Sequence, residues 1–203
     1  MPARSALSRL PPTRHRCRTA ARSASRRQPS TATSRSPASA DLWLSSTATD
    51  TDLQVTVTEV RPDGQELYVQ RGWLRASHRT LDEERSTPTR PFHTHAVADV
   101  TPLAAGVPTP VRVEVWPVNH VFRAGSALRM YVEAPVSVTG FRQLLLNPTP
   151  AVNTVHVGPE TPSRLVLSVR PGATAPTPLP ACDSVVNQPC RPNPSPAPSG
   201  GRR

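Results

Sequence analysis

Residues 53–70 read LQVTVTEVRPDGQELYVQ, and this stretch decides the fold class. Its first eight residues alternate apolar and polar side chains, the period-2 pattern of a strand that buries one face. Pro62-Asp63-Gly64 follows as a turn signal, because proline presets φ and glycine accepts a positive φ. Residues 67–70 return to the alternating pattern, so the whole stretch predicts a β-hairpin.

Six further segments are typical of short strands, because each alternates or concentrates apolar residues between turn signals. A long Pro- and Thr-rich connection occupies residues 80–108. No segment carries a sustained apolar stripe at i, i+3 and i+4, so helical crossovers are not expected. The pattern predicts an all-β protein folded as an antiparallel β-sandwich. The six segments are residues 42–46, 72–76, 111–116, 127–133, 152–157 and 164–169. Of these, 72–76 either continues the second strand of the hairpin or pairs beside it.

The composition indicates a folded domain diluted by its flanks. The 203 residues include 26 Pro, 36% hydrophobic residues and 4% aromatic residues, which is thin for one fully globular chain. Pro, Ser, Thr and Arg dominate the two ends, and such segments bury too little surface to offset their ordering entropy. We expect a disordered Arg/Ser-rich tail over 1–36, the β-sandwich over 37–172 and a disordered Pro-rich tail over 173–203.

The formal charge of +10 belongs to the N-terminal tail. Nine of the 24 basic residues precede Pro37 and no acidic residue does, which leaves 15 basic against 14 acidic residues in the rest. The predicted domain is therefore nearly neutral, and no nucleic-acid partner is expected for it. An RNA-binding arm or a transit peptide is the alternative to a plain disordered extension for the tail itself.

Three cysteines occur, with Cys17 in the basic tail and Cys182 and Cys190 close together near the C-terminus. A short Cys-x₇-Cys loop suits a disulfide in an exported protein, and two free thiols are the alternative. No second Cys or His pair stands at ligand spacing, so neither a metal nor a cofactor is expected. The chain also lacks an apolar run long enough for a membrane helix and the apolar core of a secretory signal, so no membrane partner is expected and no compartment is indicated.

Five blocks stand in fixed order along the predicted domain. They are DLWLSSTATDTD (41–52), EVRPDG (59–64), GWLRASHR (72–79), HVFRAGSALR (120–129) and PSRLVL (162–167). In this order and at these spacings, they resemble the C-terminal domain of the X-Pro dipeptidyl-peptidase and cocaine-esterase-like serine hydrolases. The Cys182 to Cys190 tail is similar to the ends of some exported members.

The resemblance implies a jelly-roll, galactose-binding-like sandwich that packs on an α/β-hydrolase domain and helps to wall its acyl or peptide pocket. In the family that partner lies in the same chain, and here it would act in trans. Family members carry the nucleophile in a G-x-S-x-G motif, and this sequence has none; residues 124–128, AGSAL, come nearest. We therefore expect an accessory domain without hydrolase activity of its own. The alternative is a stand-alone carbohydrate- or surface-binding module.

The sequence departs from the family at two places. The strand or two that should precede Asp41 are replaced by the basic tail, and residues 135–147 lack the usual Gly-Asp-rich loop and Trp.

Several residues have the chemistry of an active site, but their spacing favours structural roles. Ser77 and His78 are adjacent on an extended segment, so they should point to opposite faces and cannot pair as nucleophile and base. His93-Thr94-His95 places two imidazoles on one side of the chain, yet no third ligand lies nearby in sequence. Ser45 and Ser46 add hydroxyls without an obvious base. No catalytic, cofactor or metal residue is predicted.

The tryptophans allow two interpretations. Trp43, Trp73 and Trp116 could form an aromatic platform for a sugar, but aromatic residues in sandwich strands more often belong to the core.

The remaining motif residues are interpreted as structural. Asp50 and Asp52 should accept backbone N–H bonds in a loop. Gly125 should adopt a positive φ in the turn after Arg123. A second group lies on or just past the 72–76 strand and could face a neighbouring domain, namely Arg75, His78 and Arg79.

Overall fold

The computed structural model describes residues 26–27, 32–34, 37–135, 151–171, 174–175 and 178–194. This part of the chain consists of β-strands joined by loops and two short 3₁₀-helices, which confirms the all-β prediction. None of its helices is long and apolar enough to cross a membrane. The strands are β1 (Arg26–Arg27), β2 (Ala32–Ser34), β3 (Ala38–Ser46), β4 (Asp52–Val60), β5 (Gln65–Arg75), β6 (Thr109–Val115), β7 (His120–Phe122), β8 (Ala127–Glu133), β9 (Asn153–His156), β10 (Arg164–Val166), β11 (Val169–Pro171) and β12 (Cys190–Pro192). The helices are η1 (Ala76–His78) and η2 (Val97–Asp99).

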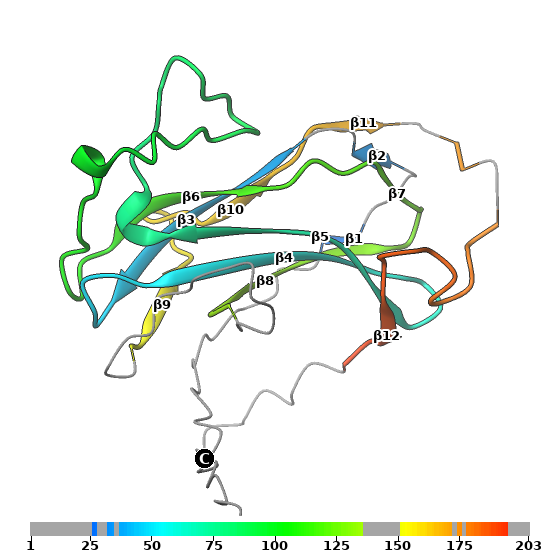
Figure 1. Ribbon diagram of the computed structural model, residues 1–203. Coiled ribbons are helices and arrows are strands. Elements are labelled where there is room, and N and C mark those ends of the chain that lie inside the picture. The colour runs from blue at the N-terminus through cyan, green and yellow to red at the C-terminus, as the bar shows by residue number, and fades with distance from the viewer. Residues whose placement is uncertain are drawn as a thin grey trace, which may run out of the picture.

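Two β layers face each other (Figure 1). The first layer is a five-stranded sheet in the order β1-β8-β4-β5-β12. The second contains β10-β3-β6, with β9 also beside β3, and is continued by β11-β2-β7. Because β2 leads into β3, β6 into β7 and β10 into β11, these two groups are successive parts of one layer. Every pairing is antiparallel, so the predicted antiparallel β-sandwich is confirmed.

The β4–β5 hairpin forms where residues 53–70 predict it. Arg61 N donates to Gln65 O at 2.8 Å across the turn, and Gly64 adopts a φ of 79°, which glycine reaches without a Cβ clash. The 72–76 segment continues β5, which is one of the two predicted arrangements. Between Val57 and Thr58 the pairing register shifts, so β5 carries a bulge.

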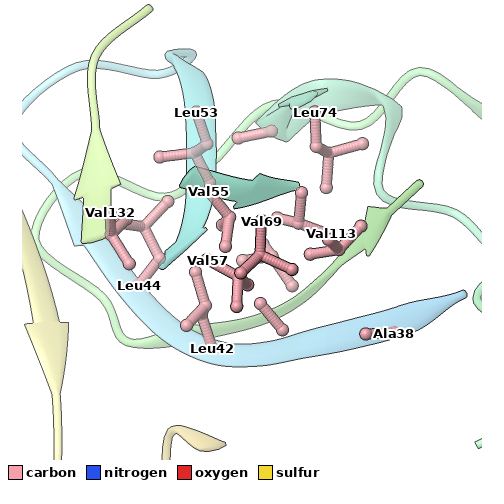
Figure 2. Close-up of a cluster of buried hydrophobic side chains, with 14 of the residues drawn as sticks. Ala38, Leu42, Leu44, Leu53, Val55, Val57, Val69, Leu74, Val113 and Val132 are labelled. Atoms are coloured by element: carbon pink, nitrogen blue, oxygen red, sulfur yellow. The ribbon is translucent and has the colours of Figure 1, made fainter. Parts of the chain in front are cut away.

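Alternate residues of β3, β4, β5, β6 and β8 meet between the layers (Figure 2). They pack as a dry core of leucine and valine side chains, which supplies the main stabilising term of the fold. The residues between them face outward, as the period of 2 predicts. The core side chains labelled in Figure 2 are Ala38, Leu42, Leu44, Leu53, Val55, Val57, Val69, Leu74, Val113 and Val132.

The two layers approach closely at Gly72 of β5. A Cβ atom there would lie 1.7 Å from the carbonyl oxygen of Glu114 on β6, so only glycine fits without moving the backbone. Beside it, Trp116 N donates to Arg71 O at 3.2 Å. The sandwich is therefore closed along this edge by direct backbone contact.

The structure differs from the prediction of a disordered tail over 1–36 at the five residues of β1 and β2. β1 pairs with β8, and β2 pairs with both β7 and β11. The expectation of disorder does not hold for these strands, since backbone pairing with distant strands orders residues whose own side chains are polar or small. The rest of segment 1–36, Cys17 included, and residues 136–150 lie outside the described residues.

The C-terminal segment also returns to the first sheet. We call residues 178–194 the strap. Its strand β12 pairs with β5, Tyr68 N donates to Pro189 O at 3.0 Å, and Cys182 and Cys190 are joined as a disulfide. The expectation of a disordered tail over 173–203 does not hold for the strap, because hydrogen bonds to an open sheet edge order a segment whose valines, Val185 and Val186, stay exposed.

Candidate functional site

Ser45 makes the closest serine–histidine contact in the described residues. Its Oγ lies 2.9 Å from Nε2 of His156, which β9 places beside β3. Nucleophilic catalysis also needs an acid that orients the histidine and donors that stabilise an oxyanion. Within the described ranges no carboxylate meets the other ring nitrogen, so the geometry gives a hydrogen-bonded pair and not a triad. Sequence reasoning named Ser45 but missed His156, which lies 111 positions away.

Ser77 and His78 have separate partners. Ser77 donates from its backbone N and its Oγ to the Asp50 carboxylate, at 2.9 and 2.7 Å. The His78 ring instead lies against His95, with the ring centroids 6.0 Å apart. Asp50 also accepts Thr51 N at 2.9 Å, so its predicted role as an acceptor of backbone N–H bonds is confirmed.

The arginines near the end of β5 hold the loops of this domain. Arg75 forms a forked ion pair with Asp52, at 2.8 and 3.1 Å. Arg79 donates to the carbonyl oxygens of Ala76 and Thr101, which ties the 79–108 connection to η1. Both side chains therefore have structural partners inside the domain.

Ser126, the serine of the motif nearest to G-x-S-x-G, belongs to a buried cluster around Glu59. Its Oγ donates to Glu59 Oε1 at 2.6 Å, and His120 Nε2 lies 2.8 Å from Glu59 Oε2. In a catalytic triad the histidine stands between serine and acid, whereas here the acid stands between serine and histidine. The turn itself is as predicted, with Gly125 at a φ of 83°.

The hydrogen bonds of this cluster keep Glu59 ionised. Burial alone would raise the pKa of the Glu59 carboxyl, but the bonds from His120 and Ser126 outweigh it and hold the pKa below its usual value. The cluster is thus a fully bonded structural anchor, which we call the Glu59 cluster. Sequence reasoning did not predict it.

Glu66 is the second buried carboxylate of the same hairpin. Oε1 accepts from Thr58 Oγ1 and Tyr131 Oη at 2.8 Å each and from Arg129 at 3.1 Å, while Oε2 accepts from Arg191 of the strap at 2.9 Å. Burial works to raise the pKa of Glu66, and the bonds from Tyr131, Thr58 and Arg191 lower it below its usual value. We call these five residues the Glu66 cluster.

Three histidine rings gather on the 79–108 connection and η1. The centroid of His95 lies 5.7 Å from that of His93 and 6.0 Å from that of His78. Burial, and then the neighbouring His95, lower the pKa of His93 to about 4, so this ring is neutral near pH 7. Within the described ranges no three His, Cys, Asp or Glu side chains are arranged to hold a metal ion.

The tryptophans face away from the core, so their interpretation as core residues is wrong. Trp43 and Trp73 are half-buried and Trp116 is 50% exposed. Each alternates with inward residues of its strand or follows the strand's end, which turns the ring outward. Trp73 and Trp116 meet edge to face at 5.3 Å, while Trp43 lies apart on β3.

A groove of about 280 Å³ lies on the outer face of the first sheet. β4, β5 and β8 form its floor, and strap residues 189–191 form one wall. Its polar and aromatic lining includes Gln54, Thr56, Tyr68, Arg71, Tyr131 and Glu133.

The bulge in β5 brings two of these side chains to the same face. Tyr68 is paired with Thr58 and Arg71 with Thr56, and both partners face outward from β4. In a regular strand, residues three apart point to opposite faces. The extra residue of the bulge shifts the alternation of side chains by one position, so Tyr68 and Arg71 both reach the groove.

The family and fold comparisons agree. The family model for the X-Pro dipeptidyl-peptidase C-terminal non-catalytic domain matches residues 37–166. Two curated mycobacterial proteins, from Mycobacterium bovis and Mycobacterium tuberculosis, are each 31% identical over 94 residues, and their names give serine esterase as a provisional function. The matched part is 45% of this chain and 15% of each relative.

Solved structures show the same sandwich. A CocE/NonD family hydrolase from Staphylococcus aureus superposes with a TM-score of 0.59 at 23% identity, over 73% of this chain and 30% of that chain. An α-amino acid ester hydrolase gives 0.54 at 21% identity, over 71% of this chain and 24% of that chain. An aminopeptidase from a Thaumarchaeota archaeon gives 0.52 at 16% identity, over 71% and 25%.

The match to the family model spans most of the described domain, and the fold comparisons agree with it over the described residues. The matched part spans 15% to 30% of the length of these proteins. The chain belongs to the family of X-Pro dipeptidyl-peptidase C-terminal non-catalytic domains.

Proposed function

We propose that this chain docks in trans onto an α/β-hydrolase domain and helps to wall that domain's acyl or peptide pocket. The observation that carries the proposal is the match of residues 37–166 to a non-catalytic domain that in its relatives shares one chain with a hydrolase domain. The reaction it would serve is hydrolysis of an ester or of an X-Pro peptide through a serine acyl-enzyme. The docking unit would be residues 37–172.

The distribution of exposed apolar side chains supports one end of the sandwich as the docking surface. Val107 and Val152 are 51% and 53% exposed. Both flank the bend between β3 and β4, because Gly106 N donates to Ser46 O and Val152 N donates to Thr47 Oγ1. Val97 on η2 is 91% exposed and lies on the connection at the same end. Exposed apolar residues gathered at one end are typical of an interaction surface.

The test uses the full chain and an α/β-hydrolase encoded in the same genome. The hydrolase polypeptide chosen should itself lack a domain of this family. Isothermal titration calorimetry should show a complex, and kcat/KM of the hydrolase for p-nitrophenyl acetate or an X-Pro-p-nitroanilide should rise when the chain is added. Val107→Asp and Val152→Asp should abolish both effects. Val186→Asp is the matched control, because Val186 is 85% exposed on the strap.

The chain alone should not label with a serine-directed fluorophosphonate, because Ser45 and Ser126 lack the parts of a triad. Labelling of the pure chain that is lost on Ser45→Ala would contradict a purely accessory role. Absence of a complex, or equal weakening by the Val186→Asp control, would contradict docking through this end.

A further inference from the structure

We propose that the groove on the outer face of the first sheet binds a neutral, hydroxyl-rich ligand, specifically a short oligosaccharide. This goes beyond hydrolase docking, since the groove lies on a sheet face and the exposed valines Val107 and Val152 lie at the end of the sandwich. The groove's volume of about 280 Å³ is just below the range of about 300–1,000 Å³ for small-molecule sites, which suits a short ligand.

Aromatic rings border the groove on two strands. Tyr68 of β5 and Tyr131 of β8 stand on either side of β4. The edge-to-face pair of Trp73 and Trp116 extends this aromatic surface beyond Arg71. A pyranose ring presents C–H groups on its faces, which pack against the electron-rich faces of aromatic rings.

A chain of hydrogen bonds orients the acceptors of the groove. Trp73 Nε1 donates to Gln54 Oε1 at 2.9 Å, and Gln54 Nε2 donates to Thr56 Oγ1 at 3.2 Å. Thr56 Oγ1 then donates to Glu133 Oε2 at 3.4 Å. Glu133 is exposed and a carboxylate has about four acceptor sites, so most of its capacity remains for ligand hydroxyls.

Arg71 supplies donors on the other side. Its guanidinium lies 5.0 Å from the Trp73 ring and 5.8 Å from the Tyr68 ring, which holds the exposed side chain in place. No hydrogen bond from this guanidinium to another described residue competes for its N–H groups. A fixed donor and a fixed acceptor facing one groove suit a ligand whose hydroxyls both donate and accept.

The charges of the groove argue against an anionic ligand. The carboxylates of Glu66 and Glu133 both line it, and Arg191 is already paired with Glu66 at 2.9 Å. The lining therefore carries no excess of positive charge, and a phosphate or nucleic acid would meet the Glu133 carboxylate beside the one available cation, Arg71.

Ligand binding in the groove should depend on the strap, because the strap forms part of the groove. Pro189, Cys190 and Arg191 form one wall, and the Cys182–Cys190 disulfide closes the loop that leads into them. Reduction of this disulfide should free that loop and weaken ligand binding without unfolding the core, which lies on the other face of the sheet.

The experiment titrates the full chain with maltotriose, cellotriose, xylotriose and chitotriose, and follows the tryptophan indole signals in ¹H–¹⁵N NMR spectra. At least one sugar should give a saturating shift of the Trp73 indole with a Kd of about 1 mM. Tyr68→Ala and Arg71→Ala should each weaken it about tenfold. Arg90→Ala, which changes an exposed arginine away from the groove, should leave it unchanged.

Glu133→Gln keeps the proposal testable if Tyr68→Ala fails to fold, because Glu133 is exposed and the amide has the same shape. It should weaken binding severalfold. Three results would overturn the proposal: no saturable shift with any of the sugars, a shift unchanged by both Arg71→Ala and Glu133→Gln, or a shift given by the dipeptide Gly-Pro and by no sugar. None of these depends on the hydrolase partner, so failure here is separate from failure of docking.

Discussion

Glu59 and Glu66 are both buried carboxylates of the β4–β5 hairpin, but different kinds of side chain stabilise them. Glu59 is bonded by one imidazole, that of His120, and by one hydroxyl, that of Ser126. Glu66 faces two arginines, Arg129 and Arg191, which stay charged at every relevant pH.

The two clusters also differ in which parts of the chain they connect. The carboxylate, serine and imidazole of the Glu59 cluster all lie within the residues matched to the family, whereas Arg191 of the Glu66 cluster comes from the strap beyond that match. A buried ion is tolerated only when its bonds repay the lost hydration. The difference shows that one cluster closes the domain on itself, while the other attaches an additional segment to an already complete sheet.

The largest expected effect is that of Glu66→Ala. Arg129 is 8% exposed, and without Glu66 it remains a buried charge. Breaking such a pair should lower the free energy of unfolding by about 3–5 kcal/mol. Urea unfolding of the full chain, followed by circular dichroism, measures this. Glu133→Ala on the same sheet face is the matched control and should change stability by about 0.5 kcal/mol or less. Equal losses in both variants would contradict the role of Glu66 in balancing the buried charge of Arg129.

Glu59→Gln should have an intermediate effect. The amide keeps the shape of the side chain, but its NH₂ group cannot accept a bond from either Ser126 or His120. The free energy of unfolding should therefore fall by about 1–3 kcal/mol, the cost of one unsatisfied buried polar group. The same urea experiment checks it. A loss as large as that of Glu66→Ala would contradict the difference in stability between the two clusters.

The outward and inward faces of the first sheet were not equally predictable from the sequence. Alternation in residues 53–60 placed Leu53, Val55 and Val57 in the core correctly, because burial on one face is a local, period-2 property. The placement of Tyr68 and Arg71 on the same outer face depends on a bulge, which has no local signal in this stretch.

The Glu66 cluster and the Ser45–His156 pair could not be predicted from the sequence for a related reason. Glu66 and Arg191 are 125 positions apart, and Ser45 and His156 are 111 apart, so only the finished strand order brings them together. The strap itself looked like a disordered tail, since its order comes from pairing with β5 and not from its own composition.

On acidification, His93 and the two glutamates should reduce the stability of the fold in different pH ranges. The pKa of His93 is lowered from 6.5 to about 4 in the folded state, so the unfolded state binds its proton first and stability is lost as the pH falls from 6.5 to about 4. The pKa values of Glu59 and Glu66 are lowered from 4.5, so their contribution is present above pH 4.5 and is lost below it.

Urea midpoints measured from pH 7 to pH 3 test this separation. His93→Gln should flatten the upper part of the profile, and Glu59→Gln should flatten only the part below pH 4.5. Flattening of the upper part by Glu59→Gln would contradict the assignment of the two windows.

The smallest expected effect is that of Arg191→Ala. The Arg191 side chain is 59% exposed. When Arg191 is replaced, Glu66 keeps its bonds from Thr58, Tyr131 and Arg129. The loss in the free energy of unfolding should therefore be about 1 kcal/mol or less, as for other exposed ion pairs.

The strap should nevertheless respond to Arg191→Ala. The amide of Tyr68 donates to Pro189 O, so its hydrogen exchange should speed up as the strap detaches more often, while amides in the core strand β6 stay protected. Arg164→Ala removes a comparably exposed partner of Asp41 on the second layer and should leave the Tyr68 amide unchanged. A stability loss near that of Glu66→Ala would mean that Arg191, and not Arg129, balances the buried carboxylate. In that case the strap would be part of the domain's own folding unit, and the contrast between the two glutamates would disappear.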